Sequence, residues 1–223
     1  MKPSDPGHGS LASDRADEEK AREFDEIATT VFAPMYPVIA GQMLERTGIR
    51  DGVAVDAGCG PALLAIALAT QSHLRVYALD TSPAMLRIAS GHIRTSGLVR
   101  RVLPVLGDVQ ELPFEDGTVD LVVSRGSWFF WDDLGGAFRE IQRVLAPGGS
   151  AYIGGGFGTA LLKDRIAAAM RSRSPDWDRR VQGRMRKNNP DRVRDELMHA
   201  GITAYLLIQD ESGFWVIIRR EES

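Results

Sequence analysis

Cysteine is almost absent from this chain, which has one cysteine in 223 residues. A single cysteine excludes an internal disulfide framework and favours a reducing compartment, so we expect a cytoplasmic protein. The four histidines are scattered without the spacing of metal ligands, and we therefore expect no bound metal. Apolar runs are short. None approaches the ~20 residues that cross a bilayer, so no membrane partner is expected.

Hydrophobic residues make up 43% and charged residues 26% of the chain, as in ordinary globular proteins. The net charge of −3 conceals a basic segment, residues 163–194, with eleven basic and four acidic side chains. This segment is either a solvated helical face or a source of positive potential that attracts an anionic substrate. Nucleic acid is disfavoured as a partner, because Trp177 is the only aromatic residue among these arginines.

The chain divides into a tail, a cover and one larger domain. Residues 1–20 are polar and rich in Ser, Asp, Gly and Pro, which predicts a flexible N-terminal tail. A helical pattern broken by Pro34 and Pro37 predicts an N-terminal helical cover over 21–47. Residues 48–223 then form an α/β domain, with a basic helical insertion at about 160–200.

Strand and helix patterns alternate through this domain. The expected strands are 53–57, 74–79, 101–106, 119–123 and 150–154, and the expected helices are 61–71, 83–96, 133–145, 160–172 and 191–200. Apolar runs on both sides of Glu211-Ser212-Gly213 predict a terminal antiparallel hairpin. The alternation predicts a parallel sheet covered on both faces, with ligands at the carboxyl ends of its strands.

The most informative motif follows the strand expected at 53–57. Asp56 ends the strand, Gly58 and Gly60 form a tight turn, and Pro61 begins a helix. Glycines let a ligand approach the backbone closely, and we expect Asp56 to direct its charge at the same place. A neutral or cationic organic cofactor suits such a corner better than a bare phosphate does.

Two further acids end the next strands. Asp80 lies 20 residues beyond Gly60, where a carboxylate accepts hydrogen bonds from ribose hydroxyls. Thr81 or Ser82 can cap the following helix, which leaves Asp80 available for a ligand. Asp108, in Gly107-Asp108-Val109, is either a turn-forming residue or an acceptor for an exocyclic amine, with Val109 covering one face of the ring.

These motifs together resemble the class I S-adenosylmethionine-dependent methyltransferases. The matching elements are Asp56–Gly60, Asp80, Gly107-Asp108, the strand Asp120–Ser124 and the segment Arg143–Gly149. The resemblance implies a Rossmann-like seven-stranded sheet, mostly parallel with an antiparallel last strand, and helices on both faces. It also implies S-adenosyl-L-methionine as cofactor and S-adenosyl-L-homocysteine as product. By this resemblance, Gly58 and Gly60 would contact the methionine part of the cofactor, Asp80 would contact its ribose, and Asp108 would lie near its adenine.

From the residues and the resemblance together we expect one set of cofactor contacts. Its members lie in the first turn, at the next strand ends and after the fourth strand: Asp56, Gly58, Cys59, Gly60, Pro61, Asp80, Thr81, Met85, Gly107, Asp108, Val109, Ser124 and Arg125. The aromatic segment Ser124–Trp131 and the glycine-rich segment Gly154–Gly158 are similar to those of a small prokaryotic branch of this superfamily.

Two alternatives to a methyltransferase stay open. A regulatory protein could keep the cofactor site without turnover. An NAD(P)-dependent oxidoreductase is weaker, because a GxGxxG pattern that starts at Gly58 needs a glycine where this chain has Leu63.

The acceptor site is expected after the fourth and fifth strands. We expect a small-molecule acceptor, with an anionic or a soft one as the options. An anionic acceptor is an option because Arg125 would repel a sulfonium unless it binds a carboxylate of the acceptor or of the cofactor. Trp128 is expected to face the ligand, while Phe129 and Phe130 pack beneath the next helix. No histidine is placed as a general base. The full set of expected acceptor contacts is Tyr36, Ser127, Trp128, Gly156 and Phe157.

Overall fold

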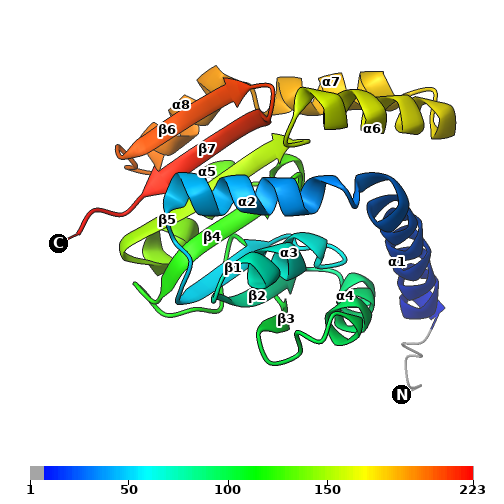
Figure 1. The fold of residues 1–223 in the computed structure, drawn as a ribbon, viewed down its shortest axis with the longest axis horizontal. Helices are drawn as coiled ribbons and strands as arrows, with labels where there is room; N and C mark the ends of the chain where they lie inside the picture. The colour runs from blue at the N-terminus through cyan, green and yellow to red at the C-terminus, as the bar shows by residue number, and fades with distance from the viewer. Residues whose placement is uncertain (1–7, 223) are drawn as a thin grey trace, which may run out of the picture.

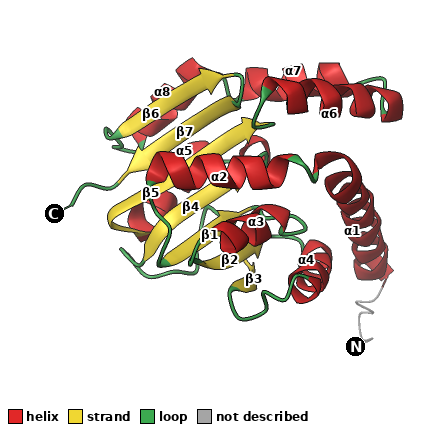
Figure 2. Ribbon diagram, viewed as in Figure 1, coloured by secondary structure: helices red, strands yellow, loops and turns green. Residues whose placement is uncertain are grey.

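The computed structural model describes residues 8–222, with side chains from residue 15 onward, and contains one seven-stranded sheet (Figures 1 and 2). The strands are β1 (Val53–Ala57), β2 (Arg75–Asp80), β3 (Val102–Leu106), β4 (Val119–Arg125), β5 (Leu145–Gly156), β6 (Tyr205–Asp210) and β7 (Gly213–Arg219). The α-helices are α1 (His8–Ile27), α2 (Met35–Thr47), α3 (Leu63–Gln71), α4 (Pro83–Thr95), α5 (Leu134–Val144), α6 (Ala160–Arg173), α7 (Trp177–Lys187) and α8 (Pro190–His199).

The strand order is β3-β2-β1-β4-β5-β7-β6. The strands β1 to β5 pair in parallel, whereas β7 pairs antiparallel with both β5 and β6. The predicted sheet and its terminal hairpin are confirmed. Because β1 and β4 are neighbours at the centre of the sheet, the chain reverses its direction of progress beside β1. Such a switch point leaves a crevice at the carboxyl ends of the strands.

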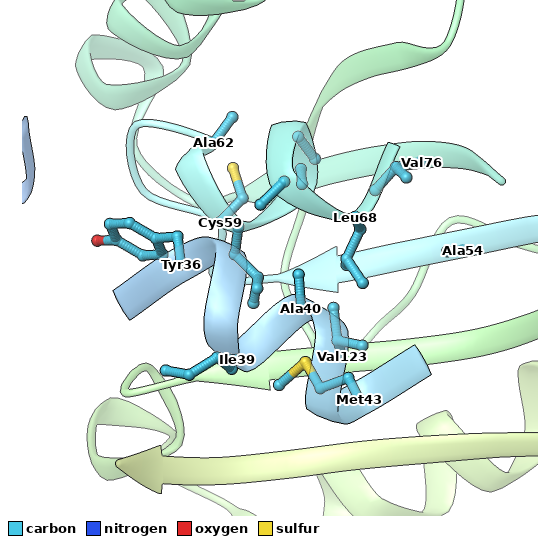
Figure 3. Close-up of a cluster of buried hydrophobic side chains, with 14 of the residues drawn as sticks. Tyr36, Ile39, Ala40, Met43, Ala54, Cys59, Ala62, Leu68, Val76 and Val123 are labelled. Carbon is cyan, nitrogen blue, oxygen red and sulfur yellow. The ribbon is translucent and has the colours of Figure 1, made fainter. Parts of the chain in front are cut away.

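Helices cover both faces of the sheet. The helices α2, α3 and α4 pack on one face, where Figure 3 shows Ile39, Met43, Leu68 and Val123 in one buried cluster. The helices α5 and α8 cover the other face. Helix α5 shows why the sequence predicts this arrangement, since its Phe138 and Ile141 are one turn apart on the buried side.

The N-terminal cover bends at Pro34, as predicted, whereas Pro37 lies within the first turn of α2 and does not break it. A π-helical turn, Ala28–Phe32, follows α1, and the axis then turns by 78° into α2. Among the described residues no single helix is long and apolar enough to cross a membrane, although this bent pair passes the length and composition test jointly.

The structure corrects the predicted tail. Helix α1 begins at His8, so residues 15–20 are helical and packed against the domain rather than a flexible tail. The Ser82 hydroxyl on α4 donates to Asp17 at 2.9 Å, and Arg87 donates to Glu18 at 3.1 Å. These contacts join segments far apart in the chain, so local composition does not reveal them. The part of the expected tail before His8 lies outside the described residues.

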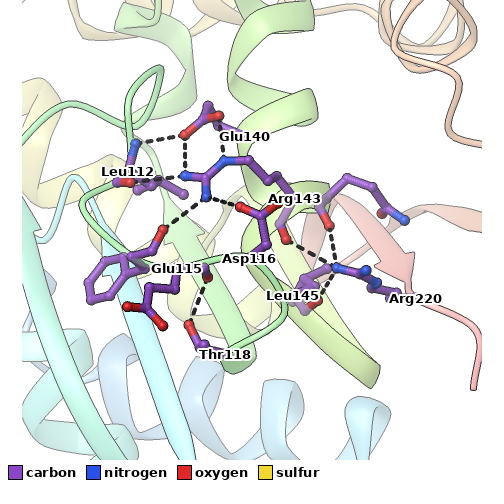
Figure 4. Close-up of polar contacts among 10 residues, drawn as sticks. Leu112, Glu115, Asp116, Thr118, Glu140, Arg143, Leu145 and Arg220 are labelled. Atoms are coloured by element: carbon purple, nitrogen blue, oxygen red, sulfur yellow. Dashed lines mark hydrogen bonds and ion pairs between the residues drawn. The ribbon is translucent and has the colours of Figure 1, made fainter.

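The Arg143 part of the sequence motif has a structural role away from the crevice (Figure 4). Its guanidinium donates to Glu140 at 2.7 Å and to the carbonyls of Leu112 and Phe114 at 3.0 and 2.9 Å. It also forms an ion pair with Asp116 at 2.6 Å. Arg143 thus fixes the loop that precedes β4 to helix α5.

Candidate functional site

The turn between β1 and α3 is held by backbone hydrogen bonds. The amides of Gly58 and Cys59 both donate to the Leu79 carbonyl, at 2.8 and 2.9 Å. Gly58 has φ +73°, and a Cβ at this position would lie 2.3 Å from the Cβ of Ser127. Only glycine fits here without strain, and its bare backbone faces the crevice.

Asp80 joins this turn to the next strand. Its carboxylate accepts from the Gly60 amide at 2.9 Å and from the Ser82 amide at 3.0 Å. The predicted helix cap is confirmed, because the Ser82 hydroxyl caps α4 by accepting from the Met85 amide at 3.0 Å. The ligand role of Asp80 stays a prediction. A carboxylate offers about four acceptor sites, so Asp80 has capacity for ligand hydroxyls as well.

These glycines and acids line a cavity of about 1010 Å³ at the carboxyl ends of the strands. We call its strand half the lining residues at the ends of β1, β2 and β3 and in the segments that follow them, namely Gly58, Gly60, Leu79, Asp80, Thr81, Met85, Gly107, Asp108, Val109 and Gln110. The expected cofactor contacts in this half are Gly58, Gly60, Asp80, Thr81, Met85, Gly107, Asp108 and Val109.

Asp56 does not direct its charge into the cavity, contrary to the prediction. The side chain is buried with 1% exposure, and its carboxyl accepts from the Ala65 amide of α3 at 3.1 Å. Burial raises the pKa of Asp56 to about 7, the Ala65 hydrogen bond opposes this rise, and the charge of Asp80 adds to it. Asp56 therefore anchors the first turn of α3 from behind the glycine turn.

Three other expected cofactor contacts also lie outside the cavity lining, namely Cys59, Pro61 and Ser124. Cys59 packs in the hydrophobic cluster with Tyr36 and Ala62 (Figure 3), and burial raises the pKa of its thiol. The Ser124 hydroxyl is buried and lies 2.5 Å from that of Ser127, which donates to the Ala57 carbonyl at 2.9 Å. Ser124 thus positions Ser127, which does line the cavity.

The opposite side of the cavity is built from long side chains. We call its helix half the lining residues from the π-helical turn, the ends of β4 and β5, and helices α6 and α7, namely Phe32, Arg125, Phe157, Lys163, Met170, Trp177, Arg180, Val181, Arg184 and Met185. The sequence predicted Arg125 as a cofactor contact and Phe157 as an acceptor contact, and the structure brings both to this half. The sequence-based prediction missed the residues of α6 and α7, although the basic excess of 163–194 was a signal for them.

Arg125 is the central cation of the helix half. Its Nε and Nη2 donate to the Gly156 carbonyl at 3.1 and 3.0 Å. Its guanidinium carbon lies 5.3 Å from the ring centres of both Phe32 and Phe157. Burial lowers the pKa of Arg125, and the positive charge of Arg184 lowers it further.

The aromatic segment is arranged opposite to the prediction. Trp128 is fully buried against Phe129 and Phe214, whereas Phe129 and Phe130 line the cavity. A 3₁₀ turn over Trp128–Phe130 rotates these side chains, and the buried Asn188 amide holds the turn by donating to the Trp128 carbonyl at 3.1 Å. This tertiary hydrogen bond decides which ring faces inward.

Tyr36, another expected acceptor contact, is buried and lies outside the cavity lining. Burial raises its pKa to about 12 although Arg125 opposes this rise, so Tyr36 is not a base at neutral pH. Of the remaining expected contacts, Gly156 and Phe157 line the cavity.

Helix α1 closes the cavity from one side. Phe24 and Ile27 belong to the lining, and a Cβ at Gly60 would lie 3.2 Å from the Phe24 ring. The cover thus reaches the turn that the sequence singled out. Within residues 15–222, no group of three or more His, Cys, Asp or Glu side chains is arranged to hold a metal ion.

The strand half fits a nucleoside joined to an amino acid. Asp80 has acceptor capacity for a ribose, Val109 is a small apolar surface beside Asp108, and bare glycine backbone lies between them. The turn amides of Gly58 and Cys59 are already engaged by Leu79, which leaves few donors for a pyrophosphate. A cavity of this size also lies at the upper end of the range for one drug-sized ligand, so it has room for a second molecule.

Comparisons with known proteins agree with this geometry. Residues 55–153 match the family described as methyltransferase domain. The crystal structure of a candidate S-adenosyl-L-methionine-dependent methyltransferase from Methanococcus maripaludis is similar to the whole molecule. Its TM-score is 0.90 at 42% identity, with 100% of this chain and 98% of that chain covered.

Curated relatives match over shorter regions. Methyltransferase GfsG of Streptomyces halstedii is 34% identical over 113 residues, which are 50% of this chain and 41% of that protein. Malonyl-[acyl-carrier protein] O-methyltransferase of Halorhodospira halophila is 31% identical over 145 residues, or 61% of this chain and 45% of that protein. The chain thus spans less than half the length of these curated relatives.

Proposed function

This chain belongs to the S-adenosyl-L-methionine-dependent methyltransferase family, and we propose that it transfers a methyl group to a small-molecule acceptor bound in the helix half of the cavity. The observation that carries the proposal is the division of one cavity into a nucleoside-like site and an aromatic, basic site. The two sites open to each other, as methyl transfer between two bound molecules requires.

The strand half would hold S-adenosyl-L-methionine. Asp80 would accept hydrogen bonds from the ribose hydroxyls, and Asp108 and Val109 would contact the adenine. Gly58 and Gly60 would lie against the methionine part, with Thr81 and Met85 beside the nucleoside. The bound cofactor supplies a methyl carbon that is activated by positive sulfur.

The residues of this chain act mainly by positioning and by excluding water. No side chain of His73, His92 or His199 lines the cavity, and Tyr36 is held protonated by burial. Phe24 and Ile27 of α1, with the rings of the helix half, exclude solvent from the space between the two sites. In-line geometry and desolvation can supply several kcal/mol of barrier reduction without a strong base.

The acceptor site is proposed to be small and partly charged. Ser127 lies at the junction of the two halves, and Gly156 and Phe157 form the wall behind Arg125. Arg125 and the cavity-lining cations of α6 and α7 favour an anionic acceptor over a neutral one.

Calorimetry tests the cofactor assignment. We expect S-adenosyl-L-homocysteine and S-adenosyl-L-methionine to bind, and NAD to show no heat of binding. Tight NAD binding without S-adenosyl-L-homocysteine binding would refute the proposal.

An acceptor screen tests turnover. Small acids, phenols, amines and thiols are incubated with the enzyme and S-adenosyl-L-methionine, and S-adenosyl-L-homocysteine is quantified. Formation above the acceptor-free rate supports a methyltransferase. Cofactor binding with no turnover across the screen would favour a regulatory protein that uses the same site.

A further inference from the structure

Three guanidinium groups in the helix half, those of Arg125, Arg180 and Arg184, have no acidic partner within the described residues. Arg180 donates to the Ser174 hydroxyl instead. Arg125 donates to the Gly156 carbonyl, and Arg184 lies over the Phe130 ring at 5.1 Å. Neither forms an ion pair with a described carboxylate. Arg184 is exposed, whereas Arg125 is half-buried. A half-buried cation is rarely left in this state, because desolvation without a partner is costly.

Arg125 and Arg184 face the same space. Both line the same cavity, and the positive charge of Arg184 lowers the pKa of Arg125, as expected for like charges. Burial and the neighbouring Arg180 also lower the pKa of Arg184 itself. A bound anion would reverse this repulsion into attraction.

The acids at this end of the cavity do not neutralise the pair. Asp210 lines the cavity but accepts from Ser212 at 2.8 Å and pairs with Arg46 at 3.2 Å. Glu211 lies exposed in the turn between β6 and β7. The remaining cavity-lining acids, Asp80 and Asp108, lie in the strand half, and Asp132 follows the aromatic turn.

The side chains and the carbonyl that surround Arg125 belong to the helix half of the cavity. Phe32, Phe157 and Arg184 all belong to the helix half, and the Gly156 carbonyl that orients Arg125 ends β5 on that side. Phe129 and Phe130 add flat apolar surface next to the cations.

We propose that the methyl acceptor carries an oxyanion, held between Arg125 and Arg184, on a flat apolar body that packs against Phe129, Phe130 and Phe157. This inference rests on the proposed function. The oxyanion, a carboxylate or a phosphate, neutralises the cations beside the positively charged sulfur of the cofactor, and the guanidinium fork fits two of its oxygens. The aromatic rings bury the apolar body and exclude water.

A matched pair of fluorescent probes tests the anion site. 8-Anilinonaphthalene-1-sulfonate carries an oxyanion on two aromatic ring systems, and N-phenyl-1-naphthylamine has the same rings without the charge. Both are titrated against the protein saturated with S-adenosyl-L-homocysteine. We expect the anionic probe to bind at least tenfold more tightly than the neutral one.

Two variants locate the effect. Arg184→Gln should weaken the anionic probe about tenfold and leave the neutral probe within twofold, whereas Arg186→Gln should change neither. Arg186 is an exposed residue of the same helix that does not line the cavity, so it is a matched control. Equal losses in the two variants, or equal losses for the two probes, would overturn the proposal.

Competition and cofactor binding complete the test. Phenyl phosphate and benzoate are added to the complex with the anionic probe, and displacement by either supports the oxyanion site and identifies the preferred anion. Displacement by neither contradicts it. Calorimetric titration of S-adenosyl-L-homocysteine into the same preparations separates the two proposals, because its failure to bind refutes the proposed function itself.

Discussion

Different kinds of contact stabilise the two halves of the cavity. In the strand half, neighbouring turns bind each other, as when the Asp80 carboxylate accepts from Gly60 and Ser82. In the helix half, long side chains from distant segments converge. Arg125 donates to the Gly156 carbonyl, and the ring centre of Phe32 lies 6.1 Å from that of Trp177. The first half is therefore rigid through its backbone, and the second depends on packing between elements.

This difference has a functional consequence. A cofactor shared across a family needs the same contacts each time, and short turns at strand ends supply them. Acceptors vary, and side chains on inserted helices can be exchanged without disturbing the sheet. Substitutions in each half should therefore change different properties.

The largest effect is expected for Gly58→Ala in the strand half. Its φ of +73° disfavours a Cβ, and the new atom would lie 2.3 Å from the Ser127 Cβ. Strain and overpacking together should lower the free energy of unfolding by about 2–5 kcal/mol, measured by urea denaturation.

Gly97→Ala is the matched control for this variant. Gly97 also has φ +73°, but no atom lies within 4 Å of its added Cβ. It should lose only the strain component, about 1–2 kcal/mol. Equal losses at both glycines would show that the tight contact at Ser127 does not matter.

Asp80→Ala should weaken cofactor binding while leaving the helix half intact. Loss of a charged acceptor should cost about 1–3 kcal/mol, or roughly 5- to 150-fold in affinity for S-adenosyl-L-homocysteine by calorimetry. Asp51→Ala, an exposed acid outside the cavity, should have no effect. If Asp80→Ala weakened binding of the anionic probe as strongly as it weakened binding of the cofactor, the two halves of the cavity would not bind their ligands independently.

Asp56→Asn tests the buried support behind the strand half. The native pKa of about 7 exceeds the unfolded value of about 4, so the folded state binds more protons between these pH values. Stability should therefore fall as pH rises from about 4 to about 7, by up to about 1.4 kcal/mol per unit. Asparagine can still accept from the Ala65 amide but does not titrate.

The comparison uses urea denaturation of both proteins at pH 4.5, 5.5, 6.5 and 8. The free energy of unfolding of the wild-type protein should fall relative to that of Asp56→Asn across this window. At higher pH the two stability curves should be parallel. Parallel curves throughout would mean that Asp56 is ionised in the folded protein at every pH tested.

The smallest effect is expected at the contact between α1 and α6. Arg173 and Glu26 form an exposed ion pair at 3.0 Å. Such pairs contribute about 0.2–1 kcal/mol, so Arg173→Gln should barely change the melting temperature. A double-mutant cycle with Glu26→Gln measures the coupling energy between the two side chains. A value above about 1 kcal/mol would show that this ion pair stabilises the packing of α1 against α6 more than an exposed pair normally does.

Much of the fold and of the strand half could be predicted because the signals are local. Strand β1 has the predicted bounds, and Asp80 follows the glycine turn at the spacing typical of ribose binding. Trp128 and Asp56 could not be placed in this way. The orientation of Trp128 depends on Asn188, 60 residues later, and the carboxyl of Asp56 is drawn toward the helix amide of Ala65.

The sequence alone determined the sheet, the glycine turn and the family, since strand periodicity, positive φ and strand-end acids are encoded within a few neighbouring residues. Only the tertiary structure decided that α1 is packed on α4, that Phe129 and Phe130 rather than Trp128 face the cavity, and that Arg184 and Arg125 line the same cavity. These facts depend on contacts between distant segments, whose geometry is fixed by packing of the whole chain.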